Sequence, residues 1–407
     1  MMGKKSGKLS IITSLVLYVY LLSAFMPVMA YLVPSVVKTV FALYLWFAFR
    51  LKFSSKWLPL LIIPVFSLIQ KVFDSPVAFL TQLYFIINLA TVAAVFWALT
   101  RGKYHALSRR LFFFIVGVYT VNAITTIVGN ILFPDASRHL ASVKYVGDMY
   151  GTYMKYNIGG FDVVYALSLS IALLAIMFKC NKNTIIRLVV LSLAVVFLFA
   201  VIQSQYTMAL VGSLALALLF FIPMNVNKKR LFPVIGITAL VLFVIGGTTD
   251  IFDAITAISG SESVGQRMDD LSTVISGDDL QEVSDVVGRF EKYMMSINAF
   301  LHSPLVGTMF SGDEVGGHSF ILDSVASYGV FGIIALVLMY RTFFKYYVSC
   351  FRDTSFGMFV KVLGVAYVLL TLFNPQPLII FISFAMPLCL LFTSQQSIHP
   401  DTVETSR

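Results

Sequence analysis

Charged side chains are scarce in this 407-residue chain. They make up 12% of the residues, whereas 58% are hydrophobic and the mean hydropathy is +0.88. Ordinary soluble domains are about a quarter charged, so this composition excludes a soluble enzyme and a disordered chain. Three cysteines, Cys180, Cys350 and Cys389, are too few for a disulfide-stabilised secreted scaffold. A membrane protein that crosses the bilayer several times is the class that remains.

The familiar motifs of several enzyme classes are also missing. The sequence contains no nucleotide-phosphate loop, no zinc-ligand spacing and no serine-hydrolase elbow. Chemistry, if present, must therefore depend on residues outside these motifs.

Long hydrophobic runs divide the chain into predicted membrane spans. A helix needs roughly 20 apolar residues to cross about 30 Å of hydrocarbon. We therefore expect an all-α polytopic membrane protein with about 12 transmembrane helices. The first run follows three lysines, as in a cleaved signal peptide, but it is long and leads into a second run, which favours a retained span. The predicted spans are 11–30, 33–49, 57–71, 78–99, 111–132, 161–178, 187–204, 206–224, 231–247, 319–340, 357–373 and 376–393.

Lysine and arginine are distributed unevenly between the two sets of connections. Of the 29 in the chain, Lys38 lies within a predicted span, seven lie on one side, and the remaining 21 lie on the other side with both termini. Cytoplasmic connections carry the excess of positive charge, so both termini are predicted to be cytoplasmic. The net charge of +9 therefore reflects membrane topology, and no nucleic-acid partner is indicated. The seven on the outer side are Lys71, Arg138, Lys144, Lys155, Arg267, Arg289 and Lys292.

Two outer connections are longer than turns. We expect N-terminal membrane helices over 1–247, which include an outer loop at 133–160, and a large extracytoplasmic loop over 248–318. C-terminal membrane helices over 319–393 and a cytoplasmic tail over 394–407 follow. In the large loop, apolar residues recur at helical spacing and predict an amphipathic helix on the outer membrane surface. These residues are Val283, Val286, Phe290, Met294, Ile297 and Leu301.

The stretch from 288 to 332 carries the most informative pattern. It contains Gly288-Arg289-Phe290-Glu291-Lys292-Tyr293, then Ser303-Pro304-Leu305-Val306-Gly307, then His318-Ser319 at the head of a span, and then Gly329 and Gly332. An arginine in a large outer loop, a Pro-Leu-x-Gly turn and a histidine opening the next helix resemble the O-antigen ligase and polymerase superfamily of bacterial membrane glycosyltransferases. The resemblance covers these residues and the general topology.

This resemblance implies a glycosyltransferase-C-like helical fold and the activity of a Wzy-type oligosaccharide repeat-unit polymerase. Such an enzyme works on the outer face of the bacterial cytoplasmic (inner) membrane. It transfers the glycan from a polyprenyl-diphosphate-linked donor to the end sugar of a lipid-linked acceptor, building O-antigen of lipopolysaccharide, capsule or exopolysaccharide. The resemblance further implies an inverting reaction without metal or cofactor. Its implied partners are the donor, the acceptor, membrane lipid, a chain-length regulator and a flippase.

Arg289 and His318 are the candidate catalytic residues. A guanidinium can neutralise the leaving diphosphate through paired, charge-assisted hydrogen bonds. An imidazole can orient or deprotonate an acceptor hydroxyl near neutral pH, and base and anchor both remain open for His318. The alternatives are structural: an arginine that reaches lipid headgroups and an ordinary interfacial histidine.

Further candidates lie near these two residues. Ser319 could position the same site or cap the helix. Asp323, about one turn into the span, could be functional or could bond to a neighbouring helix. Gly329 and Gly332, three residues apart, predict a close approach by another helix and are interpreted as structural. Arg267, Lys292 and Tyr293 complete the predicted substrate ligands of the large loop.

The smaller outer loop offers a second group. Arg138 and Lys155 could hold phosphate, and Tyr150, Tyr153 and Tyr156 could stack on sugars. An interfacial aromatic belt is the alternative. An acidic cluster in the large loop could bind a divalent ion, although a solvated surface explains it more simply, so no metal site is predicted. The cluster is Asp269, Asp270, Asp278, Asp279, Glu282 and Asp285.

Two other functions compete with polymerase. Ligases of the superfamily carry an additional arginine in a Thr-Arg or Ser-Arg step of a middle span, but the equivalent region here, Gln203-Ser204-Gln205-Tyr206-Thr207, has no basic residue. A ligase would need Arg138 or Arg267 instead, which favours a polymerase over an O-antigen ligase that joins polymer to lipid A core. A flippase would place polar groups at mid-membrane, whereas the polar residues here gather in outer loops.

Overall fold

The computed structural model describes residues 10–72, 75–100, 104–140, 149–222, 284–311, 314–348, 351, 357–372 and 377–396. These residues form helices and turns, and none of them belongs to a strand. The predicted all-α class is therefore confirmed for the described chain. The predicted span 231–247 lies outside the described residues.

Among the described residues, five helices are long and apolar enough to cross a membrane, which gives the chain the character of a helical membrane protein. They are Pro76–Leu99, Ala106–Leu132, Phe161–Cys180, Thr184–Gln203 and Phe320–Val348. Shorter apolar helices lie at several of the other predicted spans: Ile11–Phe25, Ser35–Ala48, Leu58–Val72, Gly357–Leu370 and Leu378–Leu391. The number of twelve spans remains a prediction.

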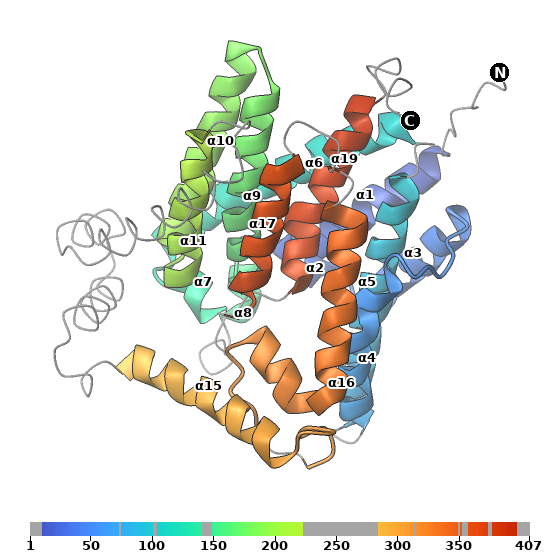
Figure 1. Cartoon of the computed structure of the whole chain (residues 1–407). Helices are drawn as coiled ribbons and strands as arrows, with labels where there is room; N and C mark the ends of the chain where they lie inside the picture. Colours follow the sequence, from blue (N-terminus) through green and yellow to red (C-terminus); the bar gives the residue numbers. More distant parts are fainter. Residues whose placement is uncertain are drawn as a thin grey trace.

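The first part of the chain, up to the large loop, contains eleven labelled helices and two short 3-10 turns among its described residues (Figure 1). In chain order these are α1 Ile11–Phe25, α2 Pro27–Leu32, α3 Ser35–Ala48, the turn η1 Leu58–Leu61, α4 Ile62–Val72, α5 Pro76–Leu99, α6 His105–Leu132, α7 Ala136–His139, α8 Tyr150–Lys155, α9 Phe161–Cys180, α10 Thr184–Gln203, α11 Thr207–Ala217 and the turn η3 Leu218–Phe220.

The second part begins inside the large loop. It comprises α15 Ser284–His302, α16 Phe320–Thr342 with the π-helical turn η4 Phe343–Val348, α17 Gly357–Leu370, α18 Pro377–Ile380, the π-helical turn η6 Phe381–Ala385 and α19 Met386–Gln396.

At two of the predicted spans the helices differ from the predicted range, each for a local reason. The first predicted span, 11–30, is interrupted: α1 ends at Phe25 and α2 starts with Pro27, because proline has no N–H to continue the helix. The span predicted at 111–132 starts earlier, at His105. The predicted span begins after Arg109 and Arg110 because charged residues lower the hydropathy. Arginine is nevertheless a good helix former, so the helix itself includes both residues.

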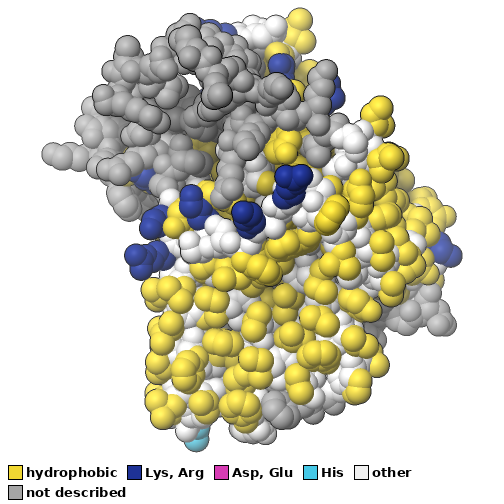
Figure 2. Space-filling view, turned by 90° about the vertical axis from the view of Figure 1, so that its right-hand side faces the viewer, with side chains coloured by type: hydrophobic (Ala, Val, Ile, Leu, Met, Phe, Trp, Pro, Cys, Tyr) yellow, Lys and Arg dark blue, Asp and Glu magenta, His cyan; other side chains and the backbone are white. Residues whose placement is uncertain are grey.

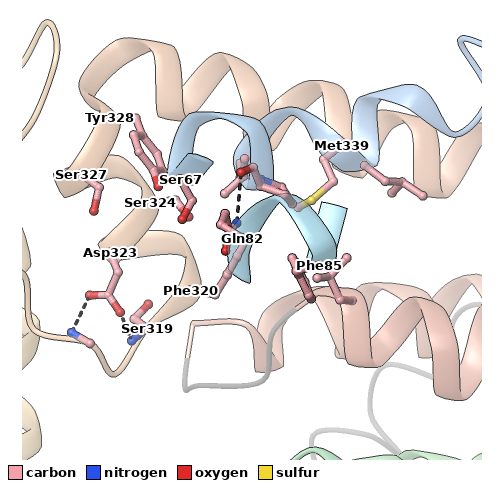
Figure 3. Close-up of a pocket in the computed structure, with 15 residues that line it drawn as sticks. Ser67, Gln82, Phe85, Ser319, Phe320, Asp323, Ser324, Ser327, Tyr328 and Met339 are labelled. Atoms are coloured by element: carbon pink, nitrogen blue, oxygen red, sulfur yellow. Dashed lines mark hydrogen bonds between the residues drawn. The ribbon is translucent and has the colours of Figure 1, made fainter. Parts of the chain in front are cut away.

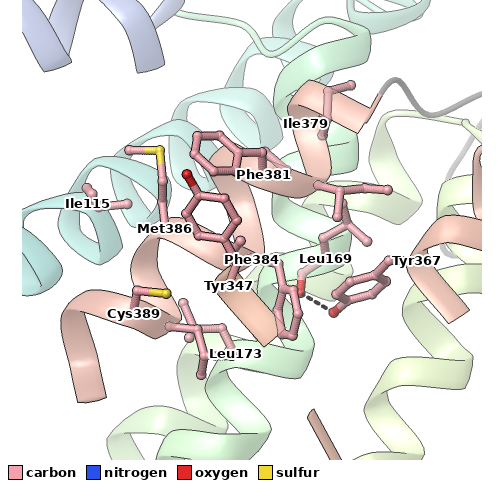
Figure 4. Close-up of a cluster of buried hydrophobic side chains, with 14 of the residues drawn as sticks. Ile115, Leu169, Leu173, Tyr347, Tyr367, Ile379, Phe381, Phe384, Met386 and Cys389 are labelled. Carbon is pink, nitrogen blue, oxygen red and sulfur yellow. Dashed lines mark hydrogen bonds between the residues drawn. The ribbon is translucent and has the colours of Figure 1, made fainter. Parts of the chain in front are cut away.

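The helix α9 forms the centre of the bundle. In an apolar 18-residue stretch of α9, 78% of the residues are buried. In the corresponding stretch of α10 only 28% are buried, so α10 exposes most of its surface. The C-terminal segments pack back onto α9: Tyr367 in α17 donates a hydrogen bond to the Leu169 carbonyl at 3.1 Å and packs its ring against Phe384 at 4.5 Å (Figure 4). This packing joins the two parts of the chain into one core.

The outer surface of the bundle is largely apolar. Figure 2 shows a broad hydrophobic face with Lys and Arg side chains along its upper margin. On α3, Val36, Val40, Leu43 and Phe47 follow one another at helical spacing and are all exposed. Soluble monomers rarely expose apolar patches of this extent, so lipid is the natural cover for this surface.

Candidate functional site

The broken helix α16 is the frame of the candidate site. Gly329 has φ 57° and ψ −139°, outside the helical region, so the helix consists of a first half before this residue and a second half after it. A β-carbon at Gly329 would lie 2.6 Å from the Pro304 carbonyl oxygen and 2.5 Å from the Leu305 carbonyl carbon. Only glycine combines this backbone conformation with such close packing.

The turn 303–307 occupies the break in α16. The Pro304 carbonyl accepts a hydrogen bond from Val330 N at 2.9 Å, and Thr308 N donates to the Ala326 carbonyl at 3.0 Å. Gly307 has a positive φ of 64°, and a β-carbon there would collide with the backbone of Ala326. The Pro-Leu-x-Gly turn therefore packs into the break in α16, and backbone hydrogen bonds hold the two together.

The prediction that Gly329 and Gly332 admit another helix was wrong. At Gly329 the close neighbour is the turn 303–307, and at Gly332 a β-carbon would collide with the Ser324 carbonyl of the same helix. The two glycines serve the bend of α16 itself, because the second half of the helix folds close to the first.

Asp323 joins three parts of the site. Its Oδ2 accepts a hydrogen bond from Ser319 N at 2.8 Å, and its Oδ1 accepts from Gly317 N at 3.2 Å and from the Ser296 hydroxyl at 2.6 Å. The carboxylate therefore bonds to a neighbouring helix, α15, and to the loop before α16. Ser319 caps α16, since its hydroxyl accepts from Leu322 N at 3.1 Å. Whether either residue also contacts substrate stays a prediction.

His318 contacts α15 through its side chain. Lys292 Nζ lies 2.6 Å from His318 Nε2. An ammonium can only donate, so a hydrogen bond between them requires Nε2 to accept, and the imidazole to be neutral with its proton on Nδ1. The pair thus places a basic nitrogen of His318 next to a cation at the start of a membrane span.

The same face of α15 runs along the loop before α16. Gly316 N donates to the Ser296 hydroxyl at 3.0 Å, and a β-carbon at Gly316 would collide with the Lys292 carbonyl. Arg289 belongs to α15, three residues before Lys292 and seven before Ser296, a spacing that places all three on one helix face. The Arg289 side chain lies outside the described residues. Tyr293, also on α15, is half-buried.

The predicted helix of the large loop is confirmed over 284–302. Met294, Ile297 and Leu301 form an exposed apolar stripe on α15, while Ser296 on another face is 1% exposed. The placement of this stripe on a membrane surface remains a prediction.

Arg138 lies on α7, beside the segment 203–207. Gln205 donates from Nε2 to the Asp135 carboxylate at the start of α7, and the Tyr206 hydroxyl donates to the Ser137 carbonyl at 2.8 Å. The Arg138 guanidinium is close enough to interact electrostatically with Tyr206. The segment 203–207 therefore contains no basic residue, but its hydrogen bonds to the α7 segment place it beside Arg138.

The rest of the smaller loop is partly structural. Tyr153 is 6% exposed and packs against Phe133 at 5.8 Å and His139 at 6.3 Å, so its ring is unavailable to sugars, which corrects the prediction for this tyrosine. Tyr150, Tyr156 and Lys155 are exposed.

Several predicted residues lie outside the described part of the chain. They are Lys144, Arg267, Asp269, Asp270, Asp278, Asp279 and Glu282, and for Asp285 only the backbone, in α15, is described.

Residues missed by the sequence reasoning anchor the smaller loop. The Asn157 side chain donates from Nδ2 to Asn122 Oδ1 at 3.0 Å and to the Thr125 hydroxyl at 2.9 Å, and its Oδ1 accepts from Val28 N at 3.1 Å. The three side chains come from two distant segments, and only the polar residues within the predicted span 111–132 could have drawn attention to them.

A cavity of about 500 Å³ is lined in part by the loop before α16, and none of its described lining residues belongs to α15. It lies between α4, α5 and α16, and Gly317, Ser319 and Asp323 form part of its lining (Figure 3). The other polar residues that line it, also missed by the sequence reasoning, are Ser67, Gln82, Ser324, Ser327 and Tyr328.

The described geometry thus brings together His318, Lys292, Ser319 and Asp323, and the backbone of α15 places Arg289 on the same helix face. Arg138 and Lys155 lie on a separate loop. Comparisons with protein-family models, with curated proteins and with solved structures give no match for the chain.

Proposed function

We propose that the chain is a polymerase of bacterial surface polysaccharide. In this proposal it transfers the glycan of a polyprenyl-diphosphate-linked donor to the end sugar of a lipid-linked acceptor. The observation that supports it most is the 2.6 Å contact between Lys292 Nζ and His318 Nε2, with Arg289 one turn earlier on the same face of α15. A cation-bearing helix beside a neutral imidazole suits a reaction that needs a stabilised anionic leaving group and an activated hydroxyl.

The chemistry requires little more than these groups. The bond between the donor sugar and its diphosphate breaks, and the electron pair stays on the diphosphate oxygen. The acceptor hydroxyl oxygen forms the new bond to that sugar carbon, and its proton passes to His318. Arg289 and Lys292 would hold the diphosphate through charge-assisted hydrogen bonds.

Lys292 has a second consequence in this scheme. In the substrate-free arrangement its ammonium donates to the nitrogen of His318 that would act as the base. A diphosphate competes for that ammonium with two negative charges, so donor binding would release Nε2 at the moment when a base is needed.

The proposed location is the bacterial inner membrane, with twelve spans in a glycosyltransferase-C-like fold and both termini in the cytoplasm. The uneven distribution of Lys and Arg supports this orientation. The arrangement in space is compatible with it, because α15 and the turn 303–307 lie at the lower end of the bundle in Figure 1, whereas α1 begins and α19 ends at the upper end. The site would then face outward.

A ligase is the second candidate, favoured by one observation. The hydrogen bonds of Gln205 and Tyr206 to the α7 segment place Arg138 beside the position where ligases carry their additional arginine. In a ligase, Arg138 would supply the second cation for the diphosphate.

Deletion of the gene in its host tests the proposal. Surface glycans are compared by gel with those of strains complemented by the wild type, Arg289→Ala, His318→Ala and, as a matched control, His302→Ala, an exposed histidine at the end of α15. The proteins are first adjusted to equal levels in the membrane.

A polymerase predicts loss of the ladder with one repeat unit still attached to its surface carrier, and restoration by His302→Ala but not by the other two variants. Full-length polymer accumulating on the lipid carrier would identify a ligase. Repeat units retained on the inner face would identify a flippase. An unchanged ladder would refute the family resemblance.

A further inference from the structure

The cavity beside the loop before α16 has two chemically different ends. Tyr328, Ser324, Ser327, Ser67 and Asp323 gather at one end, and Met339 and Phe85 lie at the other (Figure 3). Its volume of about 500 Å³ is within the range of small-molecule sites, about 300 to 1,000 Å³. The space therefore suits a compact ligand with polar groups on one side and an apolar side opposite.

The charges around the cavity exclude a phosphate ligand. Among the described residues that line it there is no Lys or Arg, and its one ionisable carboxylate, Asp323, is an acceptor. A phosphate group would be repelled by Asp323 and would find no cation in the lining. The cations of the proposed site, Lys292 and Arg289, belong to α15, which contributes none of the described residues of the lining.

Hydroxyl groups, in contrast, find partners there. A carboxylate has about four acceptor positions, and the hydrogen bonds from Ser296, Gly317 and Ser319 occupy three of those on Asp323. Gln82 is fixed by its hydrogen bond from Nε2 to the Pro64 carbonyl at 3.1 Å. Its carboxamide and the serine hydroxyls can donate to and accept from a polyol, and Phe85 and Phe320 offer aromatic faces to the apolar side of a sugar ring.

We infer that this cavity is a binding site for a neutral sugar ring, namely the end sugar of the acceptor; the inference rests on the proposed function. Gly317 and Ser319 line the cavity and flank His318, whose side chain contacts α15. A sugar in the cavity therefore lies beside the loop that carries the base, and a diphosphate on α15 lies on the other side of the same loop. Acceptor and leaving group are held apart, with His318 between them.

Binding of two lipids that differ only in their glycan tests the inference. The full-length protein in nanodiscs is titrated with the lipid-linked repeat unit extracted from the host and with undecaprenyl diphosphate that carries no sugar. The wild type is expected to bind the repeat-unit lipid about tenfold more tightly, because the sugar adds several hydrogen bonds.

Gln82→Ala removes a polar group, and Ser324→Leu fills the cavity. Each is expected to lower the affinity for the repeat-unit lipid about tenfold and to leave the affinity for undecaprenyl diphosphate unchanged. Thr81→Ala is the matched control, since Thr81 is the exposed neighbour of Gln82 on α5 and its hydroxyl donates to the Val77 carbonyl of its own helix. Gln82→Ala adds no volume, so it keeps the test decisive if Ser324→Leu does not fold.

Two results would overturn the inference while leaving the polymerase proposal intact. Equal loss of affinity for both lipids would assign the cavity to the lipid chain or to the fold, and an unchanged preference for the repeat-unit lipid would place the sugar elsewhere. Failure of the proposed function has a different signature: the glycan ladder survives gene deletion, and the wild type shows no preference for the lipid that carries sugar.

Discussion

The Ser296 hydroxyl donates a hydrogen bond to Asp323 Oδ1 at 2.6 Å and thereby joins α15 to the first half of α16. The same hydroxyl accepts from Gly316 N at 3.0 Å, and Ser296 is 1% exposed. One small buried side chain therefore fixes α15 to the start of α16.

Ser296→Ala should loosen α15. Loss of two buried hydrogen bonds costs about 1 to 3 kcal/mol, so trypsin cleavage after Arg289 and Lys292 is expected to become about tenfold faster while the rest of the protein stays folded. Time-resolved proteolysis in detergent measures this change. Asn298→Ala, at an exposed position of the same helix, is the control and should cleave at the wild-type rate. Equal rates for both variants would mean that the bond to Asp323 does not hold the helix.

Gly329→Ala should prevent correct packing of the turn 303–307. A residue with a β-carbon pays about 1 to 3 kcal/mol for the backbone conformation of this position, φ 57° and ψ −139°, and the overlap with Leu305 and Pro304 adds about 1 to 3 kcal/mol. A lower melting temperature and aggregation on size exclusion are the expected results.

Gly117→Ala provides the matched control for this substitution. Gly117 lies within α6, and a β-carbon there would meet nothing within 4 Å. Alanine is the better helix former by about 1 kcal/mol, so this variant should melt at or above the wild-type temperature. A similar fall in both variants would contradict the specific role of the break in α16.

Lys292→Met should weaken binding of the donor. The substitution removes a proposed phosphate ligand and keeps a side chain of similar length, so the KM for the donor should rise about tenfold. Lys52→Met, at an exposed position before η1, is the control and should leave this KM unchanged. An unchanged KM for the donor in Lys292→Met would show that Lys292 does not hold the diphosphate.

Asn157→Ala should destabilise the loop 133–160. The asparagine amide bridges Asn122, Thr125 and the backbone at Val28, and unsatisfied buried partners cost about 1 to 3 kcal/mol. Its backbone φ of 56° adds a small penalty for alanine. Thermal unfolding followed by tryptophan fluorescence should show a lower midpoint, and Asn157→Gly, which relieves only the backbone, should recover a small part of the loss.

The positions of several long helices could be predicted from the sequence, because these helices coincide with long apolar runs. The span predicted at 161–178 corresponds to α9, and the one at 78–99 corresponds to α5. The break at Gly329 was not predicted, since a glycine in an apolar run is equally compatible with a close helix contact. Its role depends on Pro304 and Leu305, and only the folded chain shows that they enter the gap.

The candidate site was predictable only where its residues are neighbours in sequence. The stretch 288–332 pointed to His318 and to α15, and the contact between Lys292 and His318 lies inside it. Ser67, Gln82 and Tyr328 come from three helices and share no motif. Their association depends on how α4 and α5 pack against α16, which no local pattern encodes.

The loop at 316–319 contacts both α15 and the cavity. Gly316 packs on α15, while Gly317 and Ser319 line the cavity. A ligand that shifts this loop from one side must alter the affinity on the other side, and the change is equal in both directions by thermodynamic linkage. The donor and the acceptor of the proposed reaction would therefore bind cooperatively. In initial-rate kinetics, the concentration of one substrate would change the apparent affinity for the other.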